Sequence, residues 1–150
     1  MATHADADLV LKLYDLRREP EMRKARKFMV EQFWPESFED LAKVLGGFGT
    51  QENAWFRQVV GYWSMAASFV ESGILDPDLL LDSTGEMWFV YTKLKPFIPE
   101  ARKNVHAEFL LKLEKATEKT QRGRDFIEYL KSAFEKRKQM MAQAQKAPAS

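Results

Sequence analysis

The segment from Trp55 to Ile98 most constrains the fold, because it holds nine of the chain's 19 aromatic residues. Its first half carries two overlapping apolar series at spacings of three and four: Trp55, Val59, Tyr62, Ala66 and Phe69, then Phe56, Val60, Trp63, Ala67 and Val70. Together these series cover most of the circumference of a helix, which is typical of a helix buried on nearly all sides. We therefore expect a central helix over residues 51–72, capped by Thr50 and terminated by Gly73.

The remaining face of this helix carries small and charged residues, namely Arg57, Gly61, Ser64, Ser68 and Glu71. A glycine inside a helix costs about 1 kcal/mol relative to alanine, so its presence calls for a reason. Such a stripe indicates either a neighbouring helix packed closely against it or a narrow strip facing solvent. The sequence leaves both interpretations open.

Helical spacing continues along the rest of the chain. Leu9, Leu13 and Leu16 predict an amphipathic helix over residues 6–18, and the next helix starts at Pro20 and ends at Pro35. A short helix over 36–45 is expected to stop at Gly46–Gly47, where positive φ is free of steric cost. Further helices are predicted after Asp76–Pro77, over 84–95, and from Pro99 onward. The last is long, and Gly123 interrupts or bends it before residues 126–134 continue the apolar stripe.

One segment, residues 87–91 (MWFVY), is also compatible with a buried strand, because short apolar runs are ambiguous. Helical spacing of its neighbours and the lack of a second strand candidate favour a helix. The expected fold is all-α: a single-domain bundle of about six to eight helices over residues 6–138, with a long C-terminal helix. Residues 139–150 are predicted to be a disordered tail, because they offer nothing to pack.

The composition is that of a soluble globular protein, with 45% hydrophobic and 30% charged residues and a formal net charge of +1. The absence of cysteine excludes disulfides, thiolate metal sites and a cysteine nucleophile. The longest uncharged run, Gln58–Val70, is shorter than the roughly 20 residues of a transmembrane helix. The N-terminus lacks the pattern of a secretory signal. We expect a cytoplasmic protein without a transmembrane segment.

Two stretches carry a family resemblance. The first is LYDLRREPE (13–21) followed by RKARKF (23–28), and the second is YWSMAASFVESGILDPDLL (62–80) followed by KLKPFI and Arg102. In this order they resemble the bacterial family known as domain of unknown function 4760. The family pattern favours a tryptophan where this chain has Tyr91. The resemblance implies a small helical bacterial protein and supplies no activity, cofactor or catalytic residue.

No arrangement of residues typical of an enzyme or a metal site is present. The two histidines, His4 and His106, lack the spacing of a zinc site. The acidic residues Asp76, Asp78, Asp82 and Glu86 do not match a calcium-binding loop, and helix capping accounts for Asp76. The GGFGT segment (46–50) lacks the lysine of a phosphate-binding loop. We predict neither a cofactor nor a metal, and an enzymatic role is not favoured.

The aromatic cluster is the main candidate for ligand binding, because clefts between helices are often lined by aromatic side chains. Such residues more often form a hydrophobic core, in which each buries a large area, and this second interpretation is favoured. The candidate binding residues are Trp63, Trp88, Tyr91, Arg102 and His106.

Two basic runs offer a second candidate surface. Residues 17–27 contain six basic and two acidic side chains, and residues 115–138 contain eight basic and four acidic ones. The interleaved acids indicate solvated helix faces, so nucleic-acid binding is not favoured. The leading hypothesis is a non-enzymatic module that binds a protein partner or forms a homo-oligomer through its long C-terminal helix. The alternatives are binding of an anionic polymer through the basic helices and binding of a small ligand by the aromatic cluster.

Overall fold

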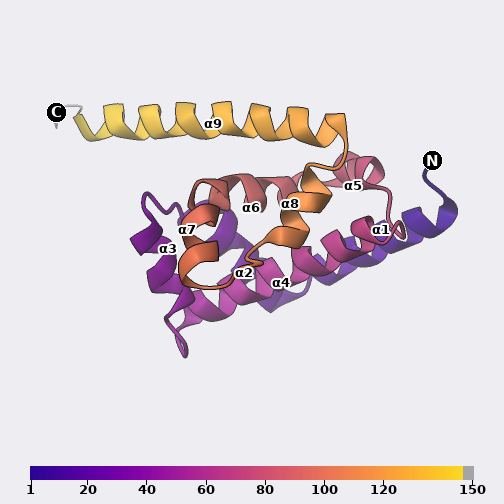
Figure 1. The fold of residues 1–150 in the computed structure, drawn as a ribbon, viewed down its shortest axis with the longest axis horizontal. Coiled ribbons are helices and arrows are strands. Elements are labelled where there is room, and N and C mark those ends of the chain that lie inside the picture. Colours follow the sequence, from indigo (N-terminus) through magenta and orange to yellow (C-terminus); the bar gives the residue numbers. More distant parts are fainter. Residues whose placement is uncertain (147–150) are drawn as a thin grey trace.

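The computed structural model describes residues 1–146 and is all-α, with no strand among these residues. Figure 1 shows the arrangement of the helices. Their bounds are α1 (His4–Arg17), α2 (Pro20–Lys27), the π-helical turn η1 (Phe28–Gln32), α3 (Phe38–Leu45), α4 (Gln51–Glu71), α5 (Pro77–Ser83), α6 (Glu86–Leu94), the 3₁₀ turn η2 (Lys95–Phe97), α7 (Ile98–Asn104), α8 (Leu111–Thr117) and α9 (Gln121–Lys146). The predicted all-α fold with a long C-terminal helix is confirmed.

Side-chain caps fix where several helices begin, because the first turn of a helix has backbone N–H groups without helical partners. The Thr50 hydroxyl accepts a hydrogen bond from Asn53 N at 3.2 Å, as predicted. The Asp76 carboxylate accepts one from Leu79 N at 2.9 Å, which confirms its capping role before Pro77. Thr3 and Asp6 form a reciprocal capping box at the start of α1.

Helix α4 is the centre of the molecule. It packs against α2, η1, α3 and α8, and Val59, Trp63 and Ala66 on it are completely buried. The prediction of a central helix over residues 51–72 is therefore confirmed. Gly61 is exposed, and a Cβ added there would meet no atom within 4 Å. Of the two interpretations of the small-residue stripe, the structure supports the solvent-facing strip.

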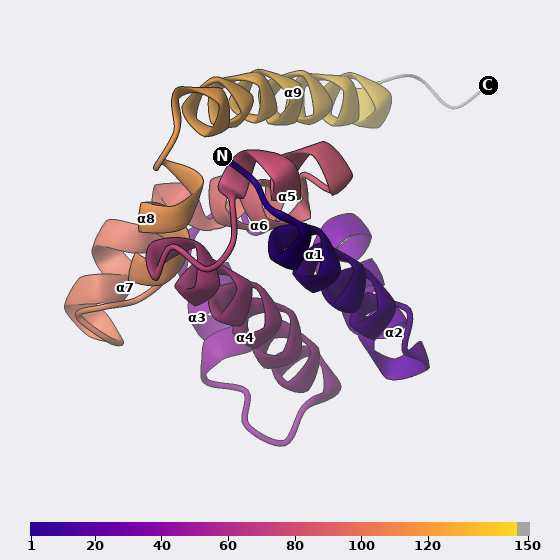
Figure 2. The ribbon, with the colours of Figure 1, turned by 90° about the vertical axis from the view of Figure 1, so that its right-hand side faces the viewer.

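Helix α9 crosses the top of the other helices (Figures 1 and 2) and packs against α5, α6 and α8. Gly123 permits its close approach. A Cβ on Gly123 would lie 2.4 Å from Thr117 O and 3.0 Å from Trp88 Nε1. Gly123 therefore does not interrupt a helix, as the sequence suggested, but lies inside α9 where two segments of backbone nearly touch.

The single long helix predicted from Pro99 is wrong, because the chain forms α7, α8 and α9 instead. The break between α7 and α8 contains neither proline nor glycine. Leu110 adopts a left-handed conformation there, with φ of +56°. This reversal buries Leu110, Leu113 and Ala116 in the core. Tertiary packing thus overrides the local preference for a continuous helix.

Two smaller expectations also need correction. In α1, Leu16 is 55% exposed and Arg17 is buried, so the inward face is rotated from the predicted one. Positive φ occurs at Gly49 and Gly73, not at the Gly46–Gly47 stop.

The C-terminal region differs in part from the predicted tail. Helix α9 continues through Lys146, so residues 139–146 are helical and exposed, and the rest of that tail lies outside the described residues. Within residues 1–146, no helix is both long enough and apolar enough to cross a membrane.

Candidate functional site

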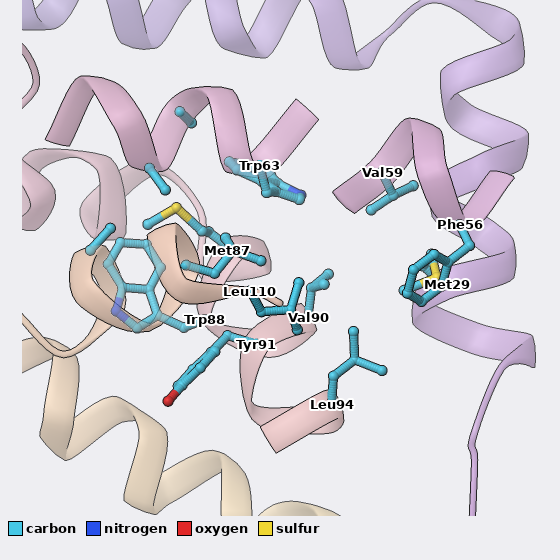
Figure 3. Close-up of a cluster of buried hydrophobic side chains, with 14 of the residues drawn as sticks. Met29, Phe56, Val59, Trp63, Met87, Trp88, Val90, Tyr91, Leu94 and Leu110 are labelled. Carbon is cyan, nitrogen blue, oxygen red and sulfur yellow. The ribbon is translucent and has the colours of Figure 1, made fainter. Parts of the chain in front are cut away.

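The three aromatic candidates lie in the core. Trp63 and Trp88 are fully buried and Tyr91 is 1% exposed. They point into the packing between α4, α6 and α8 (Figure 3). Burial raises the pKa of the Tyr91 hydroxyl. The indole N–H of Trp88 donates to Thr117 O at 3.1 Å, and that of Trp63 donates to a Glu86 carboxylate oxygen at 2.9 Å. The indole N–H groups of both tryptophans are thus satisfied within the fold.

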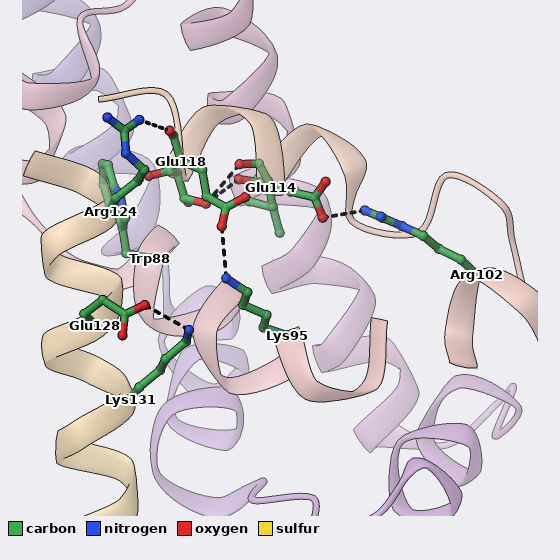
Figure 4. A network of polar contacts seen from close by, with 10 residues as sticks. Trp88, Lys95, Arg102, Glu114, Glu118, Arg124, Glu128 and Lys131 are labelled. Carbon is green, nitrogen blue, oxygen red and sulfur yellow. Dashed lines mark hydrogen bonds and ion pairs between the residues drawn. The ribbon is translucent and has the colours of Figure 1, made fainter. Parts of the chain in front are cut away.

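Arg102 and His106 lie in or next to the α7–α8 connection. Arg102 Nε donates to Phe109 O at 3.1 Å, and Arg102 Nη2 pairs with Glu114 at 3.0 Å (Figure 4). The exposed His106 accepts a hydrogen bond from Glu108 N at its Nδ1 atom, 3.1 Å away. Both side chains hold the reversal that places Leu110 in the core. The contacts of both side chains are local, and neither lines the two cavities described below.

The four acidic residues considered as a cation site are each engaged within the fold. Asp76 caps α5, and Asp78 accepts a hydrogen bond from the Thr120 hydroxyl at 2.8 Å. Asp82 pairs with Arg122 on α9. Glu86 binds two other side chains, as described next. In the described part of the chain, no group of three or more His, Cys, Asp or Glu residues is arranged to hold a metal ion.

A largely buried polar layer lies between α1, α2, α4 and α6. Glu86, at the start of α6, accepts hydrogen bonds from Arg26 Nε at 2.9 and 3.0 Å and from the Trp63 indole. Arg17 is 5% exposed, and its guanidinium lies 5.4 Å from the centre of the Trp63 ring. The Tyr62 hydroxyl donates to Leu13 O, and burial raises its pKa. This layer ties the N-terminal helices to the core, and sequence reasoning missed it because Arg26 and Glu86 are 60 residues apart.

A second group missed from the sequence joins η1, α6 and α9, and we call it the Trp34 joint: Trp34, Phe89, Lys93, Phe134 and Arg137. The Trp34 ring contacts Phe89 and Phe134 edge-on, with centroids 5.8 and 5.4 Å away. Lys93 Nζ lies 3.8 Å and Arg137 Cζ lies 3.7 Å from the centre of the Trp34 ring. The joint fixes the middle of α9 to the body.

Lys93 is the unusual member of this joint, since it is only 5% exposed and no carboxylate among the described residues pairs with it. Its ammonium donates to Met29 O and, at 2.8 Å, to Phe33 O, the carbonyls around the end of η1. Burial, aided by the charge of Arg137, lowers the pKa of Lys93 to about 7. A helix position buried this deeply is ordinarily occupied by an apolar residue.

The two basic runs lie mostly at the surface, and only some of their side chains are buried or paired within the fold. Arg17 is buried, and Arg26 pairs with Glu86 at 2.9 Å. In the second run, Lys119 lies 3.9 Å from Glu71, and Arg122 pairs with Asp82. Among the described residues, Lys136 and Lys138 have no carboxylate within ion-pair distance.

The end of α9 is the largest unpartnered element. We call residues 131–146 the distal segment of α9. Its contact stripe runs Phe134, Arg137, Met141 at spacings of three and four, so Met141 continues the face that packs on the body. All residues from 138 to 146 are exposed, including Met140 at 69% and Met141 at 49%. Figure 1 shows this end of α9 standing apart from the other helices.

Two surface cavities lie elsewhere on the molecule. One of about 360 Å³ lies between the start of α6 and α9, lined by Leu81, Gly85, Arg122, Asp125 and Phe126. The other, about 420 Å³, lies at the α1–α2 turn, lined by Asp15, Leu16, Arg18, Glu19 and Arg23. Neither contains a candidate residue predicted from the sequence. Both mix acidic and basic side chains and present no arrangement typical of catalysis.

With this geometry in view, comparison with known proteins gives one family. Residues 2–120 match the family described as Domain of unknown function (DUF4760). The chain belongs to the DUF4760 family. The match ends at Thr120, one residue before α9 begins. No curated protein and no solved structure is detectably similar to the chain.

Proposed function

We propose that this DUF4760 protein is a non-enzymatic interaction module that binds another protein through the distal segment of α9. The observation that carries the proposal is the apolar stripe of α9, which continues past its last packed residue, Arg137, into the exposed Met140 and Met141. Exposed methionines suit protein binding because their flexible side chains adapt to a partner surface. The aromatic candidates, by contrast, are packed in the hydrophobic core.

The Trp34 joint supports this proposal, because it holds α9 at Phe134 and Arg137, immediately before the exposed turns. A helix of nine residues is marginal in water by itself. Continuity with the anchored part of α9 gives residues 138–146 a preformed helical shape and a fixed direction. A partner would therefore lose little binding energy in ordering this surface.

The position of α9 relative to the family match gives further support. The matched residues 2–120 contain the core around α4, whereas α9 follows them. Helix α9 thus lies outside the matched range. A contact surface on such an element serves a specific partner without altering the core.

The test compares the wild-type chain with the double variant Met140→Ser/Met141→Ser in affinity capture from cells, followed by identification of the bound proteins. Leu11→Ser is the matched control, since Leu11 is equally exposed, at 64%, on α1. We expect an identified partner to bind the wild type and the control and to be lost from the double variant. Circular dichroism checks that all three proteins are folded. A partner that binds all three equally would refute the assignment to α9.

A further inference from the structure

We infer that the partner contributes an acidic amphipathic helix that covers Met140 and Met141 with apolar side chains and places carboxylates against Lys136 and Lys138. This inference rests on the proposed function and adds the chemistry of the partner. It follows from the charge of the distal segment, the position of its lysines, and the mismatch with a second copy of the same chain.

The distal segment is strongly basic although the chain as a whole carries a net charge of only +1. It contains one acidic residue, Glu135, and five basic ones, which gives the segment a net charge of +4. The basic residues are Lys131, Lys136, Arg137, Lys138 and Lys146. Complementary charge on a partner speeds association and excludes wrong partners, so the expected contact is acidic.

The lysines lie beside the methionines. Lys136 precedes Met140 by four residues and Lys138 precedes Met141 by three, and residues at these spacings are neighbours on a helix surface. Lys131 is paired with Glu128 at 3.0 Å, and Arg137 is held against Trp34. Of the three remaining cations, Lys136, Lys138 and Lys146, the first two lie beside the methionines and are available to a partner there. An apolar strip between two lysines is complementary to an apolar strip between two carboxylates.

A second copy of the chain is a poor occupant of this surface. Two distal segments side by side would oppose one segment of net charge +4 to another. The required complement must therefore come from a different molecule.

Fluorescence anisotropy tests this chemistry with a labelled helical peptide of about three heptads, with Leu at the a and d positions and Glu at the flanking positions. The comparison peptide has Gln in place of Glu. We expect the Glu peptide to bind at least about tenfold more tightly, and its affinity to fall as salt is raised above about 0.15 M. Equal affinity for the two peptides would overturn the inference.

The matched protein variants are Lys136→Glu/Lys138→Glu and, as control, Lys12→Glu/Lys103→Glu, which changes the net charge equally at exposed positions elsewhere. We expect the first pair to weaken the Glu peptide about tenfold or more and the control pair to leave its affinity within about twofold. Met140→Ser/Met141→Ser must also weaken it. If the methionine variant loses the captured partner and the lysine variant does not, the proposed function stands and the acidic chemistry fails.

Two further measurements separate the other occupants. Tighter binding to vesicles of anionic phospholipid than to the Glu peptide would assign the surface to a membrane and overturn the inference. Self-association of the wild type in light scattering, abolished by Met140→Ser/Met141→Ser, would assign it to a second copy. A monomer that ignores vesicles and binds the Glu peptide is the expected result.

Discussion

Lys93 of α6 and Arg137 of α9 both place their positive charge within 4 Å of the centre of the Trp34 ring, at 3.8 and 3.7 Å. Two cations sharing one indole attract the ring but repel each other. Lys93 is the buried partner, so it bears most of the cost of this arrangement. The contact makes the attachment of α9 sensitive to the protonation state of a single amine.

The first prediction concerns pH. The pKa of Lys93 is about 7 in the folded protein, compared with its ordinary value of 10.5. Between these values the unfolded chain holds a proton that the folded chain has lost, so the free energy of unfolding rises with pH. The slope from this group approaches about 1.4 kcal/mol per pH unit, and it vanishes below pH 7, where both states are protonated.

Urea unfolding between pH 6.5 and 9.5 measures this slope. Because other groups also titrate, the informative quantity is the difference between the wild type and Lys93→Met. Lys103→Met, at an exposed position, is the control. A slope that is the same in all three proteins would show that Lys93 titrates normally.

The second prediction sets two glycines of the same chain against each other. Gly123→Ala places a methyl group 2.4 Å from Thr117 O, and we expect it to destabilise the protein by about 1–3 kcal/mol. Gly61→Ala meets no neighbour, and we expect it to stabilise α4 by up to about 1 kcal/mol. Thermal and urea unfolding measure the change in the free energy of unfolding of each variant. Changes of the same sign in the two variants would contradict the packing described for α9.

The third prediction concerns the buried polar layer. Glu86→Gln removes the carboxylate that pairs with Arg26 and accepts the Trp63 indole N–H, so the Arg26 guanidinium loses its counter-charge. We expect a loss of about 2–4 kcal/mol in the free energy of unfolding. Glu21→Gln breaks the exposed pair with Lys24 and should cost less than about 1 kcal/mol. Comparable losses in the two variants would show that Glu86 acts as an ordinary surface residue.

The fourth prediction separates the anchored and exposed parts of α9. A chain ending at Lys138 keeps every packed residue of the helix, so we expect its stability to lie within about 0.5 kcal/mol of the wild type. Phe134→Ala removes a ring that contacts Trp34 and Phe89, and should cost about 1–3 kcal/mol. A large loss on truncation would mean that residues 139–146 pack on the body.

The sequence predicted what depends on local pattern. The central helix, its Thr50 cap and the Asp76–Pro77 start of α5 follow from spacing and cap chemistry within a few residues. The break before Leu110 could not be predicted, because no proline or glycine marks it and its cause is burial against a distant helix. Arg17 and Lys93 were missed for a similar reason. Each is a charged residue at a position where the pattern gives no sign of burial.

The site predictions show the same limit. The sequence shows which residues are aromatic, but not whether each ring is buried in the core or exposed to solvent. No sequence pattern singles out Trp34, because it lies just before Pro35 and outside the aromatic cluster. Its partners Phe89 and Phe134 are 55 and 100 residues away, and only the crossing of α9 over α6 brings the three rings together.

The crossing of α9 has a consequence for the matched range taken by itself. The matched domain ends at Thr120, yet its Trp34 and Phe89 rings lie beneath residues supplied by α9. In a chain that ended at Thr120, these two rings and the Lys93 ammonium would be exposed to water. Such a protein would need polar residues at those positions, or a helix from another subunit that covers the two rings.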